Sequence, residues 1–130
     1  MERPTAPRPN ILIVTTDQQR TDTLSCYGSD FTATPNIDRL ASEGVRLDRA
    51  YCTNPVCTPS RVSIFTGKQV SRHGAWNVGT HCADDERMLS HMLGDVGYRT
   101  HYVGKAHFQP FGGADSQSQE HCGAWSAGYD

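Results

Sequence analysis

Residues 10 to 16, Asn-Ile-Leu-Ile-Val-Thr-Thr, are dominated by apolar and β-branched side chains. Such a run predicts a central strand that is buried on both faces. A second strand, or a short edge piece, is predicted where Val45, Leu47 and Tyr51 alternate with polar residues. A third predicted strand covers residues 99–103.

Amphipathic helices are predicted between these strands. Residues 34–44 have a proline near the start, carry apolar residues at 37, 40 and 41, and close with a glycine. A second helix is expected from Pro59 to Gly67, with its packed face formed by Val62, Ile64 and Phe65. This prediction places Cys57 at a helix N-terminus.

Residues 84–96 predict a third helix, which Gly97 ends and whose apolar stripe comprises Met88, Leu89, Met92, Leu93 and Val96. The order of elements predicts an α/β fold with a mainly parallel sheet flanked by helices. Residues 112–130 are polar, rich in glycine and without period, which indicates a loop or a frayed end.

Polar groups follow the predicted strands and point to a site. Asp17, Lys105 and His107 come directly after strands, and Cys57 follows a few residues beyond one. Because ligands of such sheets gather at the carboxyl ends of the strands, these residues are expected to share one rim.

Composition indicates one ordinary globular domain of 130 residues, 36% apolar and 20% charged. The formal charge of −2 gives no basic surface for nucleic acid and no polybasic membrane anchor. Residues 1–8 read as a polar tail, and the apolar run 11–14 is too short for a signal core or a membrane span. A cytoplasmic protein without a membrane partner is expected.

The five cysteines are widely spaced and contain no Cys-x-x-Cys pair, so neither a disulfide framework nor a zinc ribbon is predicted. Four of them are expected to be small, semi-buried residues, with Cys57 the exception. The histidines other than His107 show no ligand spacing, so no zinc site is expected. Gly67-Lys68 and Gly104-Lys105 lack the remaining residues of a Walker-type phosphate loop.

The candidate residues suit an anionic substrate and a hard cation. Asp17 and Gln18 offer oxygen ligands for calcium, magnesium or manganese, although such an aspartate is also common as a turn or cap residue. A helix N-terminus at Cys57 favours a bound anion, which Arg61 would reach unless it is a solvated helix residue. Lys105 and His107, two positions apart, would project on the same side of an extended strand.

The segment Cys57-Thr58-Pro59-Ser60-Arg61 resembles the self-modification signature of the sulfatases. Similar family motifs follow in order along roughly residues 9–108: Pro9 to Val14, Thr34 to Ala41, Thr66-Gly67-Lys68, Arg72-His73-Gly74 and Gly104-Lys105-Ala106-His107. The chain is thus identified as similar to the N-terminal portion of a formylglycine-dependent sulfatase, of the alkaline phosphatase/sulfatase-like fold.

This resemblance implies a role for each candidate. Asp17 and Gln18 would bind a divalent metal, with calcium favoured over manganese and magnesium, and Cys57 would become formylglycine and touch the metal. Arg61 and Lys105 would hold the formylglycine hydrate, and His107 would assist there or contact the ester. The implied substrate is a small sulfate ester, and a formylglycine-generating enzyme is an implied partner.

Two departures from the family pattern leave alternatives open. Asp17-Gln18 replaces the Asp-Asp of many sulfatases and is similar to the phosphonate monoester hydrolase branch, so a phosphonate or phosphate ester is the alternative substrate. Asn77 resembles a substrate-contacting asparagine of that branch, and a turn asparagine is the competing interpretation.

The family's catalytic domain is several times longer and supplies further metal ligands. Residues 9–130 would therefore be the N-terminal portion of that domain, with the remainder as a partner, or a catalytically incomplete fragment. An incomplete fragment would expose apolar strand edges. A thiol hydrolase or redox protein using unmodified Cys57 is a third hypothesis, without an identifiable triad or resolving cysteine.

Overall fold

The computed structural model describes residues 8–108. The chain divides into two compact units, Met1–Asp48 and Arg49–Asp130. Cys122 and the predicted loop at 112–130 lie outside the described residues. Within 8–108, no helix combines the length and apolar character needed to cross a membrane.

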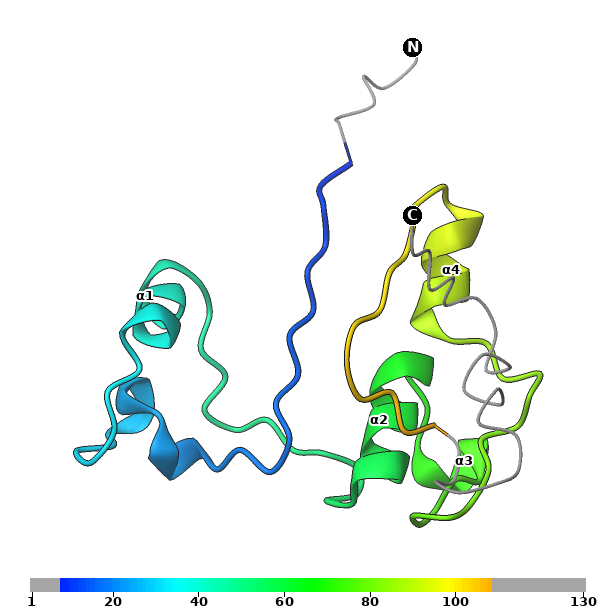
Figure 1. The fold of residues 1–130 in the computed structure, drawn as a ribbon, viewed down its shortest axis with the longest axis horizontal. Helices are drawn as coiled ribbons and strands as arrows, with labels where there is room; N and C mark the ends of the chain where they lie inside the picture. Colours follow the sequence, from blue (N-terminus) through cyan, green and yellow to red (C-terminus); the bar gives the residue numbers. More distant parts are fainter. Residues whose placement is uncertain (1–7, 109–130) are drawn as a thin grey trace. The chain divides into compact units, whose positions relative to one another are not determined.

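The first unit contains two short 3-10 helices, η1 (Thr21–Thr23) and η2 (Ser25–Tyr27), and the helix α1 (Pro35–Glu43) (Figure 1). A hydrogen-bonded cluster joins η2 to α1. The Ser25 hydroxyl donates to Asp38 over 2.6 Å, and the Thr34 hydroxyl donates to the same carboxylate over 3.1 Å. The hydrogen bond from Ser25 is the largest cause that lowers the pKa of Asp38.

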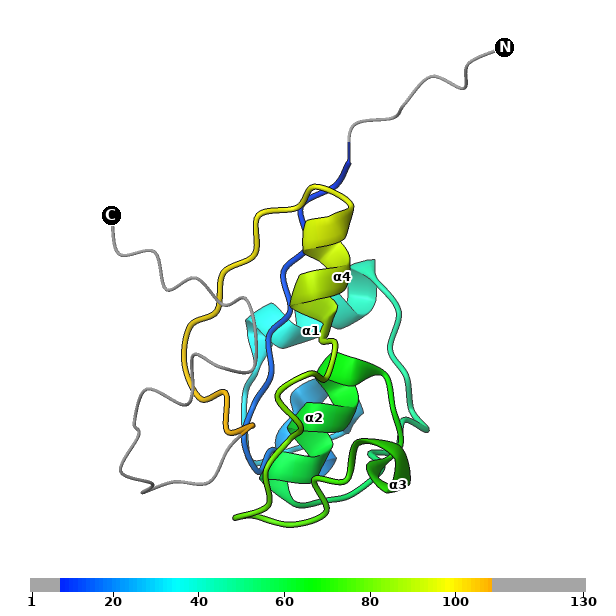
Figure 2. The ribbon, with the colours of Figure 1, turned by 90° about the vertical axis from the view of Figure 1, so that its right-hand side faces the viewer.

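The second unit contains α2 (Cys57–Thr66), α3 (Val70–His73) and α4 (Leu89–Asp95). Figure 2 shows α4 above α2, with α3 beside the lower part of α2. The buried core of this unit gathers side chains from α2, from the loops and from the segment after α4: Val62, Phe65, Ala75, Cys82, Met88 and Phe108. Phe65 and Phe108 meet edge to face, with ring centroids 5.3 Å apart.

Three predicted helices form, two of them close to their expected bounds. α1 and α2 match the predictions, and Gly67 ends α2 in a left-handed conformation with φ 69°. α4 begins at Leu89 rather than Asp84, because Glu86 instead closes a turn on Ala83 and pairs with Lys68. Its end is as predicted, since Gly97 and Tyr98 donate to the carbonyls of Gly94 and Leu93 in a Schellman motif.

The buried faces differ in part from the predicted ones. Val62 and Phe65 are buried as expected, whereas Ile64 is half exposed. Along the predicted stripe of α4, Met88 at the N-cap is buried, whereas Met92 and Val96, the latter at the C-cap, are about half exposed. Among the cysteines, Cys26 and Cys57 are half-buried and Cys82 is buried, but Cys52 is exposed against expectation.

None of the three predicted strands forms within residues 8–108. The apolar run Ile11–Val14 is exposed, with Leu12 at 87%, and Val45, Leu47, Tyr51 and Val103 are also exposed. A strand satisfies its backbone N–H and C=O groups only through neighbouring strands, whereas a helix does so internally. The described residues therefore leave the predicted sheet unconfirmed.

Candidate active site

Cys57 occupies the first position of α2 and is half-buried. Val56 before it is extended, and its carbonyl accepts the first helical hydrogen bond from Ser60 over 3.0 Å. Pro59 fits the first turn because it has no N–H to leave unpaired. The predicted position of Cys57 at a helix N-terminus is thus confirmed, in a helix long enough to carry a dipole.

The loop before Cys57 is held by side chains at both ends. The Asn54 carboxamide oxygen accepts the backbone N–H of Val56 over 2.8 Å. The Thr53 hydroxyl donates to the hydroxyl of Ser63, on α2, over 2.7 Å. These two contacts define the path by which the chain enters the helix.

Arg61 is buried rather than solvated, at 7% exposed. Its guanidinium donates to the backbone carbonyl of Lys105 over 2.7 Å. The hydroxyl of Tyr102 donates to the same carbonyl. The structure therefore brings the Arg61 side chain together with the backbone of Lys105.

Lys105 and His107 do not share one side of a strand. Lys105 is exposed, whereas His107 is 3% exposed and has a left-handed backbone with φ 52°. The prediction of a common side was wrong because no strand covers these residues, and Phe108 draws the chain into the core. His107 consequently lies inside the second unit while the Lys105 side chain faces solvent.

Asn77 lies in a turn. Its carboxamide oxygen accepts the N–H of Val78 over 2.8 Å, and its backbone carbonyl accepts the hydroxyl of Thr80 over 2.6 Å. The side chain is exposed at the surface of the second unit. These contacts match the turn interpretation of Asn77.

Asp17 and Gln18 belong to the first unit, where both are exposed. Gln18 has a left-handed backbone with φ 55°, which ends the extended run before η1. Their adjacent oxygens suit a hard cation. Within residues 8–108, no three His, Cys, Asp or Glu side chains gather as a metal site.

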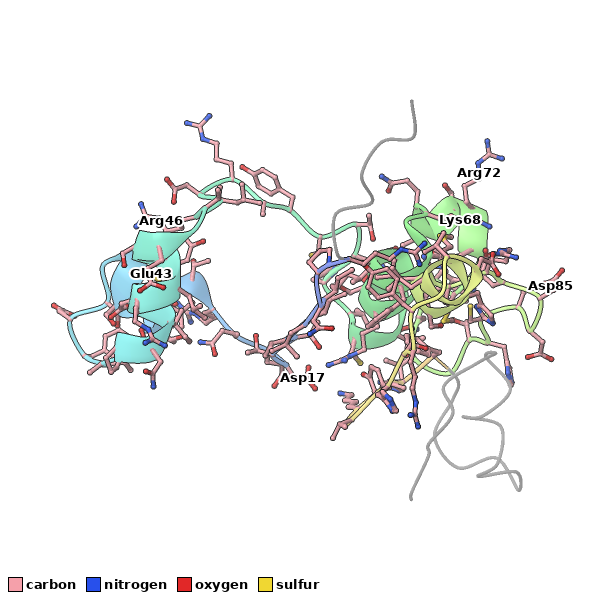
Figure 3. All side chains as sticks on the ribbon, turned by 90° about the horizontal axis from the view of Figure 1, so that it is seen from above. Asp17, Glu43, Arg46, Lys68, Arg72 and Asp85 are labelled. Carbon is pink, nitrogen blue, oxygen red and sulfur yellow. The ribbon has the colours of Figure 1, made fainter. Side chains whose placement is uncertain are left out.

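Sequence reasoning missed a polar cluster of Thr53, Ser63 and His73, in which Ser63 and His73 are buried and Thr53 is exposed. The Ser63 hydroxyl lies 2.8 Å from Nε2 of His73, and Nδ1 of His73 accepts the N–H of Ala75 over 3.2 Å. Burial is the largest cause that lowers the pKa of His73, while Glu86 raises this pKa and Lys68 lowers it. The available signal was the Arg72-His73-Gly74 motif, in which Arg72 points outward (Figure 3) and His73 inward.

A cavity of about 420 Å³ lies along α4, away from these residues. Its lining combines two arginines, one carboxylate and several hydroxyls: Arg87, Ser90, His91, Gly94, Asp95, Tyr98, Arg99 and Thr100. No predicted site residue lines it. The chemistry indicated by the sequence therefore centres on the start of α2 instead.

The chain matches the protein-family model described as Sulfatase over residues 9–129. It is 41% identical over 100 residues to the uncharacterized sulfatase YidJ of Escherichia coli. It is 39% identical over 100 residues to N-acetylglucosamine-6-O-sulfatase of Bacteroides thetaiotaomicron. Both matches cover 77% of this chain, but only 20% and 18% of the respective relatives.

Solved structures agree with these relatives. A protein in complex with its substrate D-glucosamine-2-N,6-O-disulfate superposes with a TM-score of 0.76 at 38% identity, over 79% of this chain and 21% of that one. The putative sulfatase yidJ from Bacteroides fragilis gives a TM-score of 0.69 at 28% identity, over 85% and 25%. Both neighbours have the alkaline phosphatase-like fold. The chain spans about a fifth of the length of the curated relatives it matches.

Proposed function

Because the chain belongs to the sulfatase family, we propose that its protein hydrolyses sulfate esters with a nucleophile derived from Cys57. The observation that carries this proposal is Cys57 at the first position of α2, one helical turn from the buried Arg61. The N-terminal end of a helix favours an anion there. The guanidinium of Arg61, one helical turn further on, would add a positive charge near that anion.

Cys57 would act after oxidation to formylglycine by a formylglycine-generating enzyme. The hydrated aldehyde would supply one hydroxyl as nucleophile and a second that allows sulfate to leave. Lys105, exposed and attached to Arg61 through its carbonyl, would offset charge on the sulfuryl oxygens. His107, held buried by the neighbouring core residue Phe108, would hold or donate a proton there.

A divalent metal would complete the site. Asp17 and Gln18 present adjacent, exposed oxygen donors, a chemistry that fits calcium, manganese or magnesium. Further ligands would come from other parts of the family's domain. We also infer that the complete domain contains the mainly parallel sheet, in which residues 10–16 and 99–103 would become strands.

A sulfated amino sugar is the first substrate to test. The solved neighbour with a TM-score of 0.76 carries D-glucosamine-2-N,6-O-disulfate as its substrate, and one relative is an N-acetylglucosamine-6-O-sulfatase. The Asp17-Gln18 pair favours an aryl phosphonate as the second candidate. Asn77 would contact the substrate through its amide nitrogen, because its carboxamide oxygen is engaged in the turn.

The test begins with the full chain produced together with a formylglycine-generating enzyme. Trypsin releases Ala50 to Arg61, which contains Cys57 and also the exposed Cys52 as an internal control. Mass spectrometry should show an aldehyde at Cys57 and a thiol at Cys52. Glucosamine 6-sulfate, an aryl sulfate and an aryl phosphonate are then assayed with and without a chelator.

We expect chelator-sensitive release of sulfate that Cys57→Ala abolishes and Cys52→Ala leaves intact. Preferential cleavage of the phosphonate would contradict the sulfate ester as substrate and support the second candidate, a phosphonate ester. Hydrolysis by protein whose Cys57 remains a thiol, blocked by alkylation, would support the thiol chemistry instead. A converted Cys57 without turnover of any ester would contradict the proposal for this chain.

A further inference from the structure

Two buried groups, the Ser63 hydroxyl and the His73 imidazole, and the hydroxyl of the exposed Thr53 connect the helix of Cys57 to its surroundings. The Ser63 hydroxyl, on α2, is hydrogen-bonded to the hydroxyl of Thr53 in the preceding loop over 2.7 Å. It is also hydrogen-bonded to Nε2 of His73, on α3, over 2.8 Å. Ser63 and His73 are 8% and 4% exposed. Buried polar groups of this kind persist when their hydrogen bonds are satisfied, so the contacts hold both neighbours of α2 to the same side chain.

The direction of the hydrogen bonds follows from the ring of His73. Nδ1 accepts the N–H of Ala75, so it carries no proton, and Nε2 of the neutral ring is the donor to Ser63. The Thr53 hydroxyl also donates to Ser63. Because both lone pairs of the serine oxygen are engaged and no carboxylate orients the imidazole, this pair is not arranged as a nucleophile and base.

Thr53 precedes Cys57 by four residues, and Ser63 follows it by six. Their hydrogen bond therefore closes a ring of chain that contains Cys57. Inside this ring, Asn54 fixes the turn at Val56 over 2.8 Å. The position of Cys57 relative to α2 is consequently determined by the entry of the loop, and the loop is tied to Ser63.

We propose that Thr53, Ser63 and His73 form a positioning cluster, which fixes the nucleophile at position 57 without touching the substrate. The inference rests on the proposed function only in taking position 57 as the nucleophile. Loss of the cluster should slow the chemical step because a small displacement of a reacting group has a large effect on rate. Substrate binding, measured by KM, should change less than kcat does.

Three cysteines make the cluster testable without any turnover. Each lies in a different tryptic peptide, so their alkylation rates can be followed together in the unconverted full chain. Cys57 reports on the cluster, the buried Cys82 reports on the core of the same unit, and Cys26 reports on the first unit. The alkylation rate of a half-buried or buried thiol rises when the structure around it opens locally.

The variants Thr53→Val, Ser63→Ala and His73→Leu should each accelerate alkylation of Cys57 about fivefold, the effect of one lost hydrogen bond. Cys82 and Cys26 should keep their rates. His73→Gln, which retains a side-chain N–H donor, should restore most of the protection of Cys57. The matched control is Thr66→Val, because the Thr66 hydroxyl is also buried on α2 but bonds only locally, to Val62 and Lys68.

In the converted enzyme, the same three variants should lower kcat about 10- to 100-fold and change KM by less than about threefold. Equal acceleration at Cys57 and Cys82 would overturn the inference, since it indicates general loosening of the unit. Unchanged Cys57 rates in all three variants would also overturn it. If the converted wild-type enzyme is inactive, that result counts against the proposed function. The alkylation rates of Cys57 in the unconverted chain then still decide whether the positioning cluster exists.

Discussion

Arg61 joins two parts of the second unit that are 44 residues apart in sequence. The sequence singled out this arginine as a candidate site residue, because its motif places it one turn after Cys57. What the sequence did not reveal is its burial and its carbonyl partner. Motifs record the spacing of residues, whereas burial depends on which distant segment returns to cover them.

Arg61→Lys should reduce sulfate ester hydrolysis at least tenfold, because an ammonium cannot serve both a buried carbonyl and an anion as a guanidinium fork does. The free energy of unfolding should fall by about 1–3 kcal/mol from the weakened contact with Lys105. Steady-state kinetics and urea unfolding measure the two effects. Arg72→Lys, on an exposed arginine of α3, is the control and should change neither.

His73 should make stability depend on pH. Its folded pKa lies below the ordinary value of 6.5 because of burial, Glu86 raises it and Lys68 lowers it. As pH falls below 6.5, the unfolded state binds a proton that the folded state does not, so stability is lost until the folded pKa is reached. A proton on Nδ1 would also displace the N–H of Ala75.

Urea unfolding between pH 5 and 8 measures this dependence. His73→Gln should flatten the curve in the window just below pH 6.5, whereas His81→Gln, which changes an exposed histidine, should leave it intact. A wild-type curve that stays flat there would contradict the buried, neutral state of His73.

Helices were predicted well at the scale of elements, because their signals are local. Proline in the first turn of α2 and glycine after its end fix its bounds without reference to other segments. The strands stay predictions, since the run Ile11–Val14 needs neighbouring strands to pair its backbone groups. For the same reason, the predicted rim of Asp17, Cys57 and Lys105 stays a prediction.

Gly67→Ala should destabilise the second unit by about 1–2 kcal/mol, because a side chain strains the left-handed backbone. A methyl group there meets no atom within 4 Å, so the strain is the whole effect. Gly94→Ala in α4 also meets no atom but has no left-handed backbone, and should stabilise the chain by about 0.5–1 kcal/mol. Thermal unfolding of both variants measures these opposite signs.

At the scale of the whole molecule, the two units differ in how much apolar surface they bury. The second unit has a contiguous core around Val62 and Met88. The described part of the first unit has no buried hydrophobic residue, and Leu12, Val14 and Leu47 are exposed. Exposed apolar segments in an extended conformation tend to pair or pack with other segments, either of the same protein or of other molecules.

Self-association of the full chain is therefore expected to rise with concentration. The double variant Leu12→Lys, Val14→Lys should reduce it, because charge on an extended edge opposes pairing. The matched control adds two lysines at exposed, uncharged polar positions of α1, Asn36 and Ser42, and should have a smaller effect. Light scattering at increasing concentration measures the association, and a monodisperse wild-type chain would contradict the expectation.

The contacts around α2 also imply an order of assembly. Thr53 and His73 each reach Ser63 across ten residues, whereas Arg61 reaches Lys105 across 44. Loop-closure entropy makes the longer connection costlier by about 1.3 kcal/mol, and shorter loops close faster. During folding, the chain around Cys57 should therefore acquire its native conformation before the segment carrying Lys105 forms its contact with Arg61.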